Sequence, residues 1–266
     1  MLDFRGKVAL VTGGTMGIGL ETALAFGRRG AACALTYKWG TADEDEVRSR
    51  FAAAGAPAPL IVRADAADSE DTDALLAEIG RRHARVDVFV SNVSAALIIN
   101  KLDDYSPRAL FTSIEYSAWP LVEYTMRIKR AFGAHPRYVI GMSSTGPDAY
   151  SKGYDFMAAA KAVMETLCRY LNYRLYDEGV RVNVVRSRNV RTLALRDTFG
   201  DDFERFARRF VRDEHYIEAK EVADVVVALC SGWLDGVSGQ TLTVDRGTTF
   251  FDNLMRLFDE RGRLAL

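Results

Sequence analysis

The sequence is poor in the residue types that build metal centres, disulfide frameworks and membrane spans. It contains three cysteines and three histidines among 266 residues. Cys33, Cys168 and Cys230 lie too far apart for the paired spacing of zinc sites or small disulfide-rich domains, and the histidines are equally scattered. We therefore expect no bound metal. No stretch approaches the roughly 18 uninterrupted apolar residues of a membrane span.

The chain also lacks an excess of charge of either sign. Its 35 basic and 36 acidic residues leave a net charge of -1. No long-range field would gather nucleic acid or an anionic membrane surface, so neither is expected as a partner. Charged residues interrupt the short apolar run at the N-terminus, unlike the core of a secretion signal. A cytoplasmic protein is expected.

No linker, repeat or low-complexity tract divides the sequence, so residues 1–266 are predicted to form a single domain. Short β-branched runs alternate with segments of helical period, which is typical of βαβ units and a parallel sheet. We count seven strands, and expect one long helix over about 106–130 and another over about 154–176. The predicted fold is α/β, a doubly wound Rossmann-type sheet with helices on both faces.

A glycine-rich turn follows the first predicted strand and opens a helix. Gly13 permits a tight turn, Gly17 lets a pyrophosphate approach the backbone, and Gly19 allows close packing of helix and strand. The helix N-terminus supplies unpaired N–H donors. The turn therefore predicts a dinucleotide site, to which these residues would contribute: Gly13, Thr15, Met16, Gly17, Ile18 and Gly19.

Tyr154 and Lys161 lie seven residues apart on the helix predicted over 154–176. Seven residues return to the same helix face within about 20°, with an axial separation of roughly 10 Å. A phenol and an ammonium group therefore face the same side and form the expected chemical centre.

Together these motifs resemble the short-chain dehydrogenase/reductase family over nearly the whole chain. The resemblance implies an NAD(P)H-dependent oxidoreductase in which Asp65 and the neighbouring Ala66 face the adenine and Asn92 braces the ribose side. Lys161 would bind the nicotinamide ribose. The family's Asn-Asn-Ala-Gly turn reads Ser-Asn-Val-Ser here, so Ser94 replaces its glycine.

The end of the second predicted strand bears on the choice of cofactor. An acidic residue there would accept from a ribose 2′-hydroxyl, but this strand ends with Lys38. A lysine can pair with a 2′-phosphate as a point charge, or remain a solvated surface residue. We predict NADP(H) rather than NAD(H).

The Tyr-x6-Lys spacing is similar to that of the enoyl-thioester reductases within the family. This implies hydride transfer to a 2-enoyl thioester, with Tyr154 stabilising the enolate oxygen. The pair Ser143 and Ser144 instead resembles the carbonyl-reducing branch, although the Asn of that branch's proton relay is missing from the fourth helix. A ketone or β-ketoacyl reductase is therefore the alternative. The altered Gly and Pro-Gly sites leave a cofactor-binding regulator without turnover as a third.

Past the sixth predicted strand, the resemblance assigns contacts with the nicotinamide end to the Val190 backbone and the Thr192 hydroxyl. Arg188 stands in the family's Pro-Gly segment, where it would either clash or recruit an anion. The polar, Arg-rich segment over about 192–216 is a candidate substrate lid. Expected partners are a small-molecule or thioester substrate, an acyl-carrier protein, and further copies of the chain in a dimer or tetramer.

Overall fold

The computed structural model describes residues 2–39, 43–95, 98–191, 202–203 and 205–264. Seven parallel strands form its main sheet in the order β3-β2-β1-β4-β5-β6-β9. This confirms the predicted strand number and the doubly wound topology, because the order runs outward in both directions from β1 and β4. The strands are β1 (Val8–Val11), β2 (Ala32–Tyr37), β3 (Leu60–Arg63), β4 (Val88–Ser91), β5 (Tyr138–Ser144), β6 (Arg181–Ser187) and β9 (Thr241–Val244).

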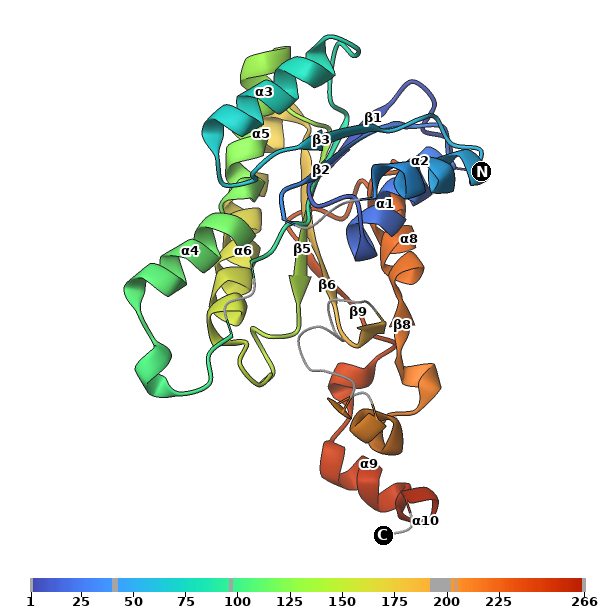
Figure 1. Ribbon diagram of the computed structural model, residues 1–266, viewed down its shortest axis with the longest axis vertical. Helices are drawn as coiled ribbons and strands as arrows, with labels where there is room; N and C mark the ends of the chain where they lie inside the picture. The colour runs from blue at the N-terminus through green and yellow to red at the C-terminus, as the bar shows by residue number, and fades with distance from the viewer. Residues whose placement is uncertain (1, 40–42, 96–97, 192–201, 204, 265–266) are drawn as a thin grey trace.

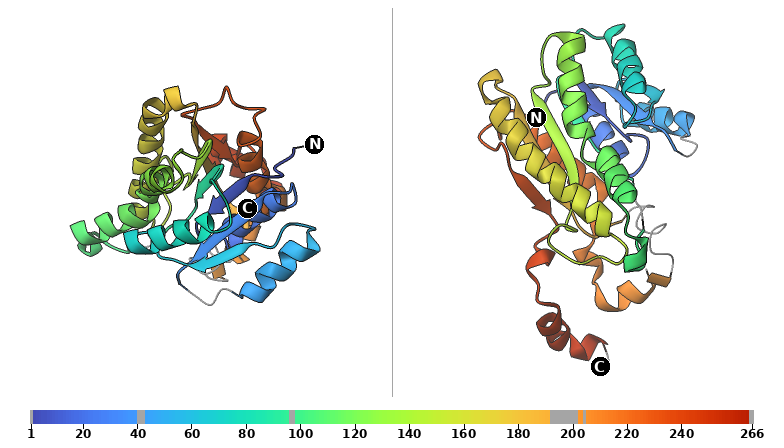
Figure 2. Two further views of the ribbon diagram at one scale, coloured as in Figure 1. Left: turned by 90° about the horizontal axis from the view of Figure 1, so that it is seen from above. Right: turned by 90° about the vertical axis from the view of Figure 1, so that its left-hand side faces the viewer.

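Helices cover both faces of this sheet (Figures 1 and 2). Strands β1 and β4 are buried throughout, because parallel strands between two helical layers expose neither face. One layer contains α1 (Gly17–Gly27), α2 (Glu44–Ala53) and α8 (Ala219–Leu229). The other contains α3 (Ser69–Gly80), α4 (Pro107–Ser117), α5 (Pro120–Phe132) and α6 (Asp155–Arg174).

The prediction of one helix over 106–130 is wrong, since α4 ends at Ser117 and α5 begins at Pro120. Proline has no backbone N–H to donate to the preceding turn. The backbone leaves the helical angles at Ala118 (φ −126°, ψ −49°), whereas Trp119, directly before Pro120, keeps them. The backbone N–H of Trp119 still bonds to the Ile114 carbonyl, and the chain then turns into a new helix with proline at its first position.

Smaller elements follow β6. Strands β7 (Val190–Arg191) and β8 (Ile217–Glu218) form a separate two-stranded sheet that the sequence analysis did not predict. Beyond β9, α9 (Asn253–Asp259) and α10 (Arg261–Leu264) extend away from the main sheet (Figure 1). Four short 3-10 helices complete the described elements: η1 (Leu102–Asp104), η2 (Tyr176–Glu178), η3 (Asp213–His215) and η4 (Thr248–Phe250).

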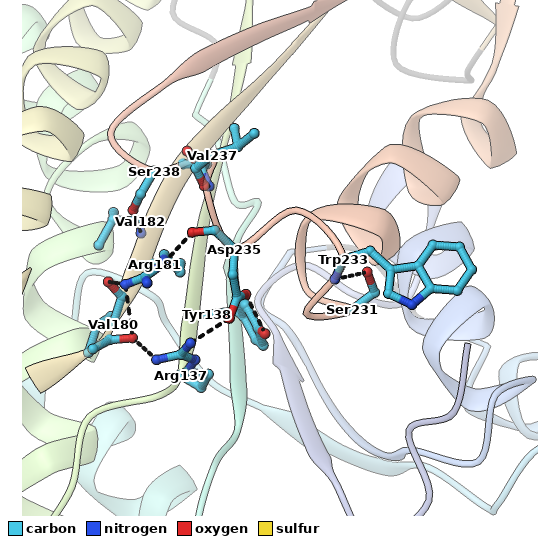
Figure 3. A network of polar contacts seen from close by, with 12 residues as sticks. Arg137, Tyr138, Val180, Arg181, Val182, Ser231, Trp233, Asp235, Val237 and Ser238 are labelled. Carbon is cyan, nitrogen blue, oxygen red and sulfur yellow. Dashed lines mark hydrogen bonds and ion pairs between the residues drawn. The ribbon is translucent and has the colours of Figure 1, made fainter. Parts of the chain in front are cut away.

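A polar network holds the amino-terminal edge of the sheet (Figure 3). Asp235, in the loop between α8 and β9, accepts hydrogen bonds from Arg137 at 2.6 Å and from the Tyr138 hydroxyl at 2.8 Å. Its backbone carbonyl accepts from Arg181 at 2.6 Å. These contacts join the starts of β5 and β6 to the loop, at the opposite end of the strands from the cavity described next.

Candidate active site

A cavity of about 830 Å³ opens at the carboxyl ends of the parallel strands. This is the edge at which doubly wound sheets bind ligands, because the loops there converge where the strand order reverses. The volume lies within the usual range for ligand and cofactor pockets. Its lining includes most of the predicted site residues: Gly13, Thr15, Met16, Gly17, Ile18, Lys38, Asp65, Ala66, Asn92, Ser143, Ser144, Tyr154 and Lys161.

The glycine turn has the conformation that a pyrophosphate site requires. Gly13 and Gly17 have φ values of +61° and +54°, in the left-handed region. A Cβ on Gly19 would lie 2.3 Å from the Gly13 carbonyl oxygen, so only glycine permits this close packing. No side chain in the described part of the chain caps the start of α1 at Met16. Its first N–H groups are thus available to a phosphate, and the turn fits a dinucleotide.

Asn92 braces the glycine turn. Its side-chain amide donates to the carbonyls of Thr12 and Gly13 at 3.0 and 3.1 Å, and its backbone N–H donates to the Thr12 hydroxyl at 3.0 Å. The amide group therefore holds the end of β4 against the end of β1. The role that the resemblance assigned to it, on the ribose side, stays a prediction.

Lys38 and Asp65 form an ion pair at one end of the cavity. The hydroxyl of Tyr116, on α4, lies 2.8 Å from the Lys38 ammonium and 3.1 Å from the Asp65 carboxylate. Desolvation alone would lower the pKa of Lys38, but these hydrogen bonds outweigh it and the pKa is raised. The pKa of Asp65 is lowered, because the bonds to Lys38, Tyr116 and the Ala67 backbone overcome its burial.

The sequence analysis missed several residues that line this end of the cavity, among them Tyr116, Trp39 and Arg50. Trp39 lines the cavity 58% exposed, with its ring centroid 5.0 Å from that of Tyr116. Arg50, on α2, also lines the cavity and pairs with Glu21 of α1. An arginine beyond a predicted strand end is not distinguishable in sequence from a solvated helix residue, so no local signal indicated it.

Tyr154 lies at the N-cap of α6, so the helix begins one residue later than predicted. Its ring packs closely on Gly146, where an added Cβ would lie 2.7 Å from two ring carbons. Burial raises the pKa of the Tyr154 phenol, although a hydrogen bond with the Ser144 side chain acts in the opposite direction. The phenol is therefore protonated at neutral pH and available as a donor.

Lys161 is 4% exposed and lies on α6, seven residues after Tyr154. Its ammonium group donates to the Ser94 hydroxyl at 2.5 Å and to the Met142 carbonyl at 2.6 Å. Burial lowers its pKa to about 7, against the opposing charge of Glu165 one turn further along the helix. Ser94, the departure from the family's glycine, thus contacts the candidate catalytic lysine directly.

The two predicted site serines, Ser143 and Ser144, have different partners. Ser144 contacts Tyr154, whereas the buried Ser143 donates to the Glu165 carboxylate at 2.7 Å. Arg186, on β6, also donates to both oxygens of Glu165, at 3.1 and 2.6 Å. Ser143 is therefore held in a structural network although it borders the cavity. Glu165 was not predicted, because a single acidic residue on a helix is ordinarily solvated.

The segment after β6 is only partly described. Val190 is buried in β7, while Ser187 at the end of β6 and Arg191 directly after Val190 line the cavity. Arg188 donates to the Thr248 carbonyl at 3.2 Å. Whether it clashes with a ligand or recruits an anion stays a prediction. Thr192 and residues 193–201 of the candidate lid lie outside the described residues.

The described end of the candidate lid is attached to the C-terminal helices. Arg212 pairs with Glu260 at 3.1 Å, and Arg256 of α9 donates to the Phe210 carbonyl at 2.7 Å. Within the residues that the structure describes, no cluster of His, Cys, Asp and Glu could hold a metal ion. Nor is any described helix long and apolar enough to cross a membrane.

Comparison with known proteins agrees with this geometry. The family model described as Enoyl-(Acyl carrier protein) reductase matches residues 13–249. The chain belongs to this family. It is accordingly an oxidoreductase of the short-chain dehydrogenase/reductase type, with NAD(P)H as the class of cofactor.

The individual relatives have low sequence identity to this chain, and their names give different substrates. The chain is similar to the NADH-dependent enoyl-[acyl-carrier-protein] reductase of Aquifex aeolicus, with 27% identity over 91% of each chain. It is 27% identical to 1-cyclohexenylcarbonyl-CoA reductase of Streptomyces collinus, over 91% of this chain and 87% of that one. A solved 7α-hydroxysteroid dehydrogenase complexed with NADH and 7-oxo glycochenodeoxycholic acid aligns with a TM-score of 0.81 at 22% identity, over 92% and 95% of the two chains.

Proposed function

We propose that this protein reduces the carbon–carbon double bond of a 2-enoyl thioester with NADPH. The observation that carries the proposal is the placement of Tyr154, at the start of α6, and Lys161, within it, in the same cavity as the glycine turn. Relatives in the family that reduce enoyl thioesters support the substrate class. NADPH, when bound, would supply the hydride for the β-carbon.

The protein's own groups would manage the charge that develops on the substrate. Tyr154 donates a hydrogen bond to the thioester carbonyl as it gains enolate character, which is oxyanion stabilisation. Its raised pKa keeps the phenol protonated for this task. The Lys161 ammonium, where protonated, favours negative charge at the same oxygen and binds the ribose hydroxyls, and a proton from water completes the reaction at the α-carbon.

The preference for NADPH rests on the cations at the end of β2. Lys38 and Arg50 both line the cavity there, and either can pair with a 2′-phosphate. Each already has a carboxylate partner, Asp65 and Glu21 respectively. A phosphate would therefore compete for existing ion pairs, so we expect a modest preference and test it below.

Ser144 supports carbonyl reduction as a second candidate function. Its contact with Tyr154 corresponds to the serine that orients a ketone beside the acid of the carbonyl-reducing branch. The steroid dehydrogenase of similar fold was solved with an oxo substrate. A polyketide-type or β-ketoacyl substrate would fit this alternative.

One assay separates these possibilities. NADPH and NADH oxidation are measured with a 2-enoyl thioester, a 3-ketoacyl thioester and a panel of polycyclic ketones. We expect turnover of the enoyl thioester, and a fall in kcat on the order of 10² or more for Tyr154→Phe. The control Tyr150→Phe alters an exposed tyrosine four residues earlier and should retain the parent rate. Parent-level turnover by Tyr154→Phe would refute the assignment, and inactivity on every substrate would favour a regulator.

We also propose that the protein assembles as an oligomer through α4 and α5 and accepts its substrate from an acyl-carrier protein beneath a lid over about 192–216. Near the start of α5, Leu121 is buried in the chain's own core, whereas Trp119 remains 43% exposed. Phe111 on α4 is 64% exposed. Light scattering that gives a monomer mass would count against this assembly.

A further inference from the structure

Ser94 stands between a buried ammonium group and solvent. Lys161 is only 4% exposed, whereas Ser94 is exposed to solvent. The two side chains meet at 2.5 Å, and the other hydrogen bond of Lys161 is directed inward, to a backbone carbonyl of β5. The serine hydroxyl therefore links the buried lysine to an exposed position on the wall of the same cavity.

The backbone around Ser94 is held on both sides. The N–H of Ala95 donates to the Ser117 hydroxyl of α4 at 3.2 Å. On the other side, the N–H of Asn92 donates to the Thr12 hydroxyl. Ser117 stands in the helix region where the sequence analysis looked for the relay asparagine of the carbonyl-reducing branch. Here that helix supports the loop instead, and the loop directs its own hydroxyl at Lys161.

A lysine in this environment needs a route for protons. Its pKa of about 7 means that it exists in both protonation states near neutral pH. Bulk water reaches the side chain poorly, so exchange requires a hydrogen-bonding group that can both donate and accept. A serine hydroxyl does both by rotating its O–H bond, and α4 contains no asparagine for that purpose.

We propose that Ser94 relays protons between solvent and Lys161. A solvent water gives a proton to the Ser94 oxygen and is left as hydroxide in the bulk solvent, while the serine's own proton passes to the lone pair of the neutral Lys161 amine. The reverse steps return the proton to hydroxide and discharge the ammonium. No oxidation or reduction is involved. The inference rests on the proposed function in that it treats Lys161 as part of the reaction centre.

The test compares Ser94→Ala and Ser94→Gly, the second of which restores the family's residue, with the conservative Ser94→Thr. Ser49→Ala, at an exposed position on α2, is the control. In protein labelled with 15N-lysine, NMR measures how fast the Lys161 ammonium exchanges with water and at which pH it titrates. The solvent isotope effect on kcat and the KM for NADPH are measured in parallel.

We expect both hydroxyl-deleting variants to slow this exchange by about tenfold and to lower kcat comparably, with KM for NADPH changed less than twofold. Ser94→Thr should approach the parent on both readouts, and Ser49→Ala should match it. Exchange in Ser94→Ala as fast as in the parent would overturn the relay. That result combined with an inactive Tyr154→Phe would leave the proposed function intact, so the two failures are distinguishable.

Discussion

Two lysines lie in the same cavity, and their pKa values move in opposite directions. The Lys38 side chain is 31% exposed and pairs with the Asp65 carboxylate, which raises its pKa despite partial desolvation. Lys161 is almost fully buried and donates to a hydroxyl and a carbonyl, and burial lowers its pKa to about 7. Residue type is the same at both ends, so the surroundings alone set the difference.

This contrast separates two uses of an ammonium group. With a carboxylate partner and access to water, Lys38 remains a permanent cation suited to an anionic phosphate. Lys161 has no hydrogen bond to a carboxylate among the described residues and is shielded from water, so it changes protonation state near neutral pH. A group that transfers protons in a reaction needs such a pKa. Substitutions at the two lysines and at their charged neighbours test this distinction.

Removing the buried lysine should have the largest effect. We expect Lys161→Met to lower kcat/KM on the order of 10³-fold, because both ribose binding and charge stabilisation are lost. Steady-state kinetics with NADPH and the enoyl thioester measure this. Lys152→Met, at an exposed position in the neighbouring loop, should stay within about twofold of the parent; an equal loss there would indicate a general effect on folding.

The same variant tests the lowered pKa through stability. The pKa of Lys161 is about 7 in the folded protein and takes the ordinary lysine value of 10.5 in the unfolded chain. Between these values the unfolded chain binds the additional proton, so its contribution to stability rises with pH and is lowest below pH 7. The difference in unfolding free energy between parent and Lys161→Met should grow by on the order of 3 kcal/mol from pH 6.5 to 9.5.

Urea denaturation of both proteins at the two pH values provides this comparison. Taking the difference removes the contribution of the buried thiols, whose raised pKa values make the parent's stability fall with pH over part of the same range. A difference that does not change with pH would mean that Lys161 is charged in the folded protein throughout.

The Glu165 carboxylate, one helical turn from Lys161, forms a buried ion pair with Arg186. Glu165→Met would leave Arg186 with only its contact to the exposed Asp148, and should cost about 3 kcal/mol of stability. The double variant Glu165→Met/Arg186→Met should recover most of this loss, since the remaining unpaired charge is removed with its partner. Thermal or urea unfolding of all four proteins measures the coupling; strictly additive losses would show that the pair acts independently.

Changes at the half-buried Lys38 should have the smallest effects. Lys38→Met should reduce the ratio of NADPH to NADH affinity by about tenfold, because one of the cations near the 2′-phosphate is lost. Asp65→Asn should increase this ratio a few-fold, since it frees Lys38 and removes a repelling charge. Titration of each protein with both cofactors checks this, and a parent preference for NADH would contradict the proposed cofactor.

Much of the fold was predictable because its signals are local. Most strands of the main sheet contain a short apolar run, and the glycine turn is specified by three residues within seven positions. Pro120 was also visible in the sequence as a signal for a helix break, but the prediction of one helix over 106–130 disregarded it. Arg50 and Glu165 had no such signal, because their importance comes from residues to which the fold brings them.

Local sequence is enough to specify the alternation of strands and helices, the turn that fits a pyrophosphate, and a tyrosine and a lysine near the start of α6. The groups that surround these residues are set by how the chain packs. Ser94 reaches Lys161 across 67 positions, and Ser143 reaches Glu165 across 22. A pKa depends on burial and on contacts of this kind, so the chemistry of the cavity emerges only when distant segments pack together.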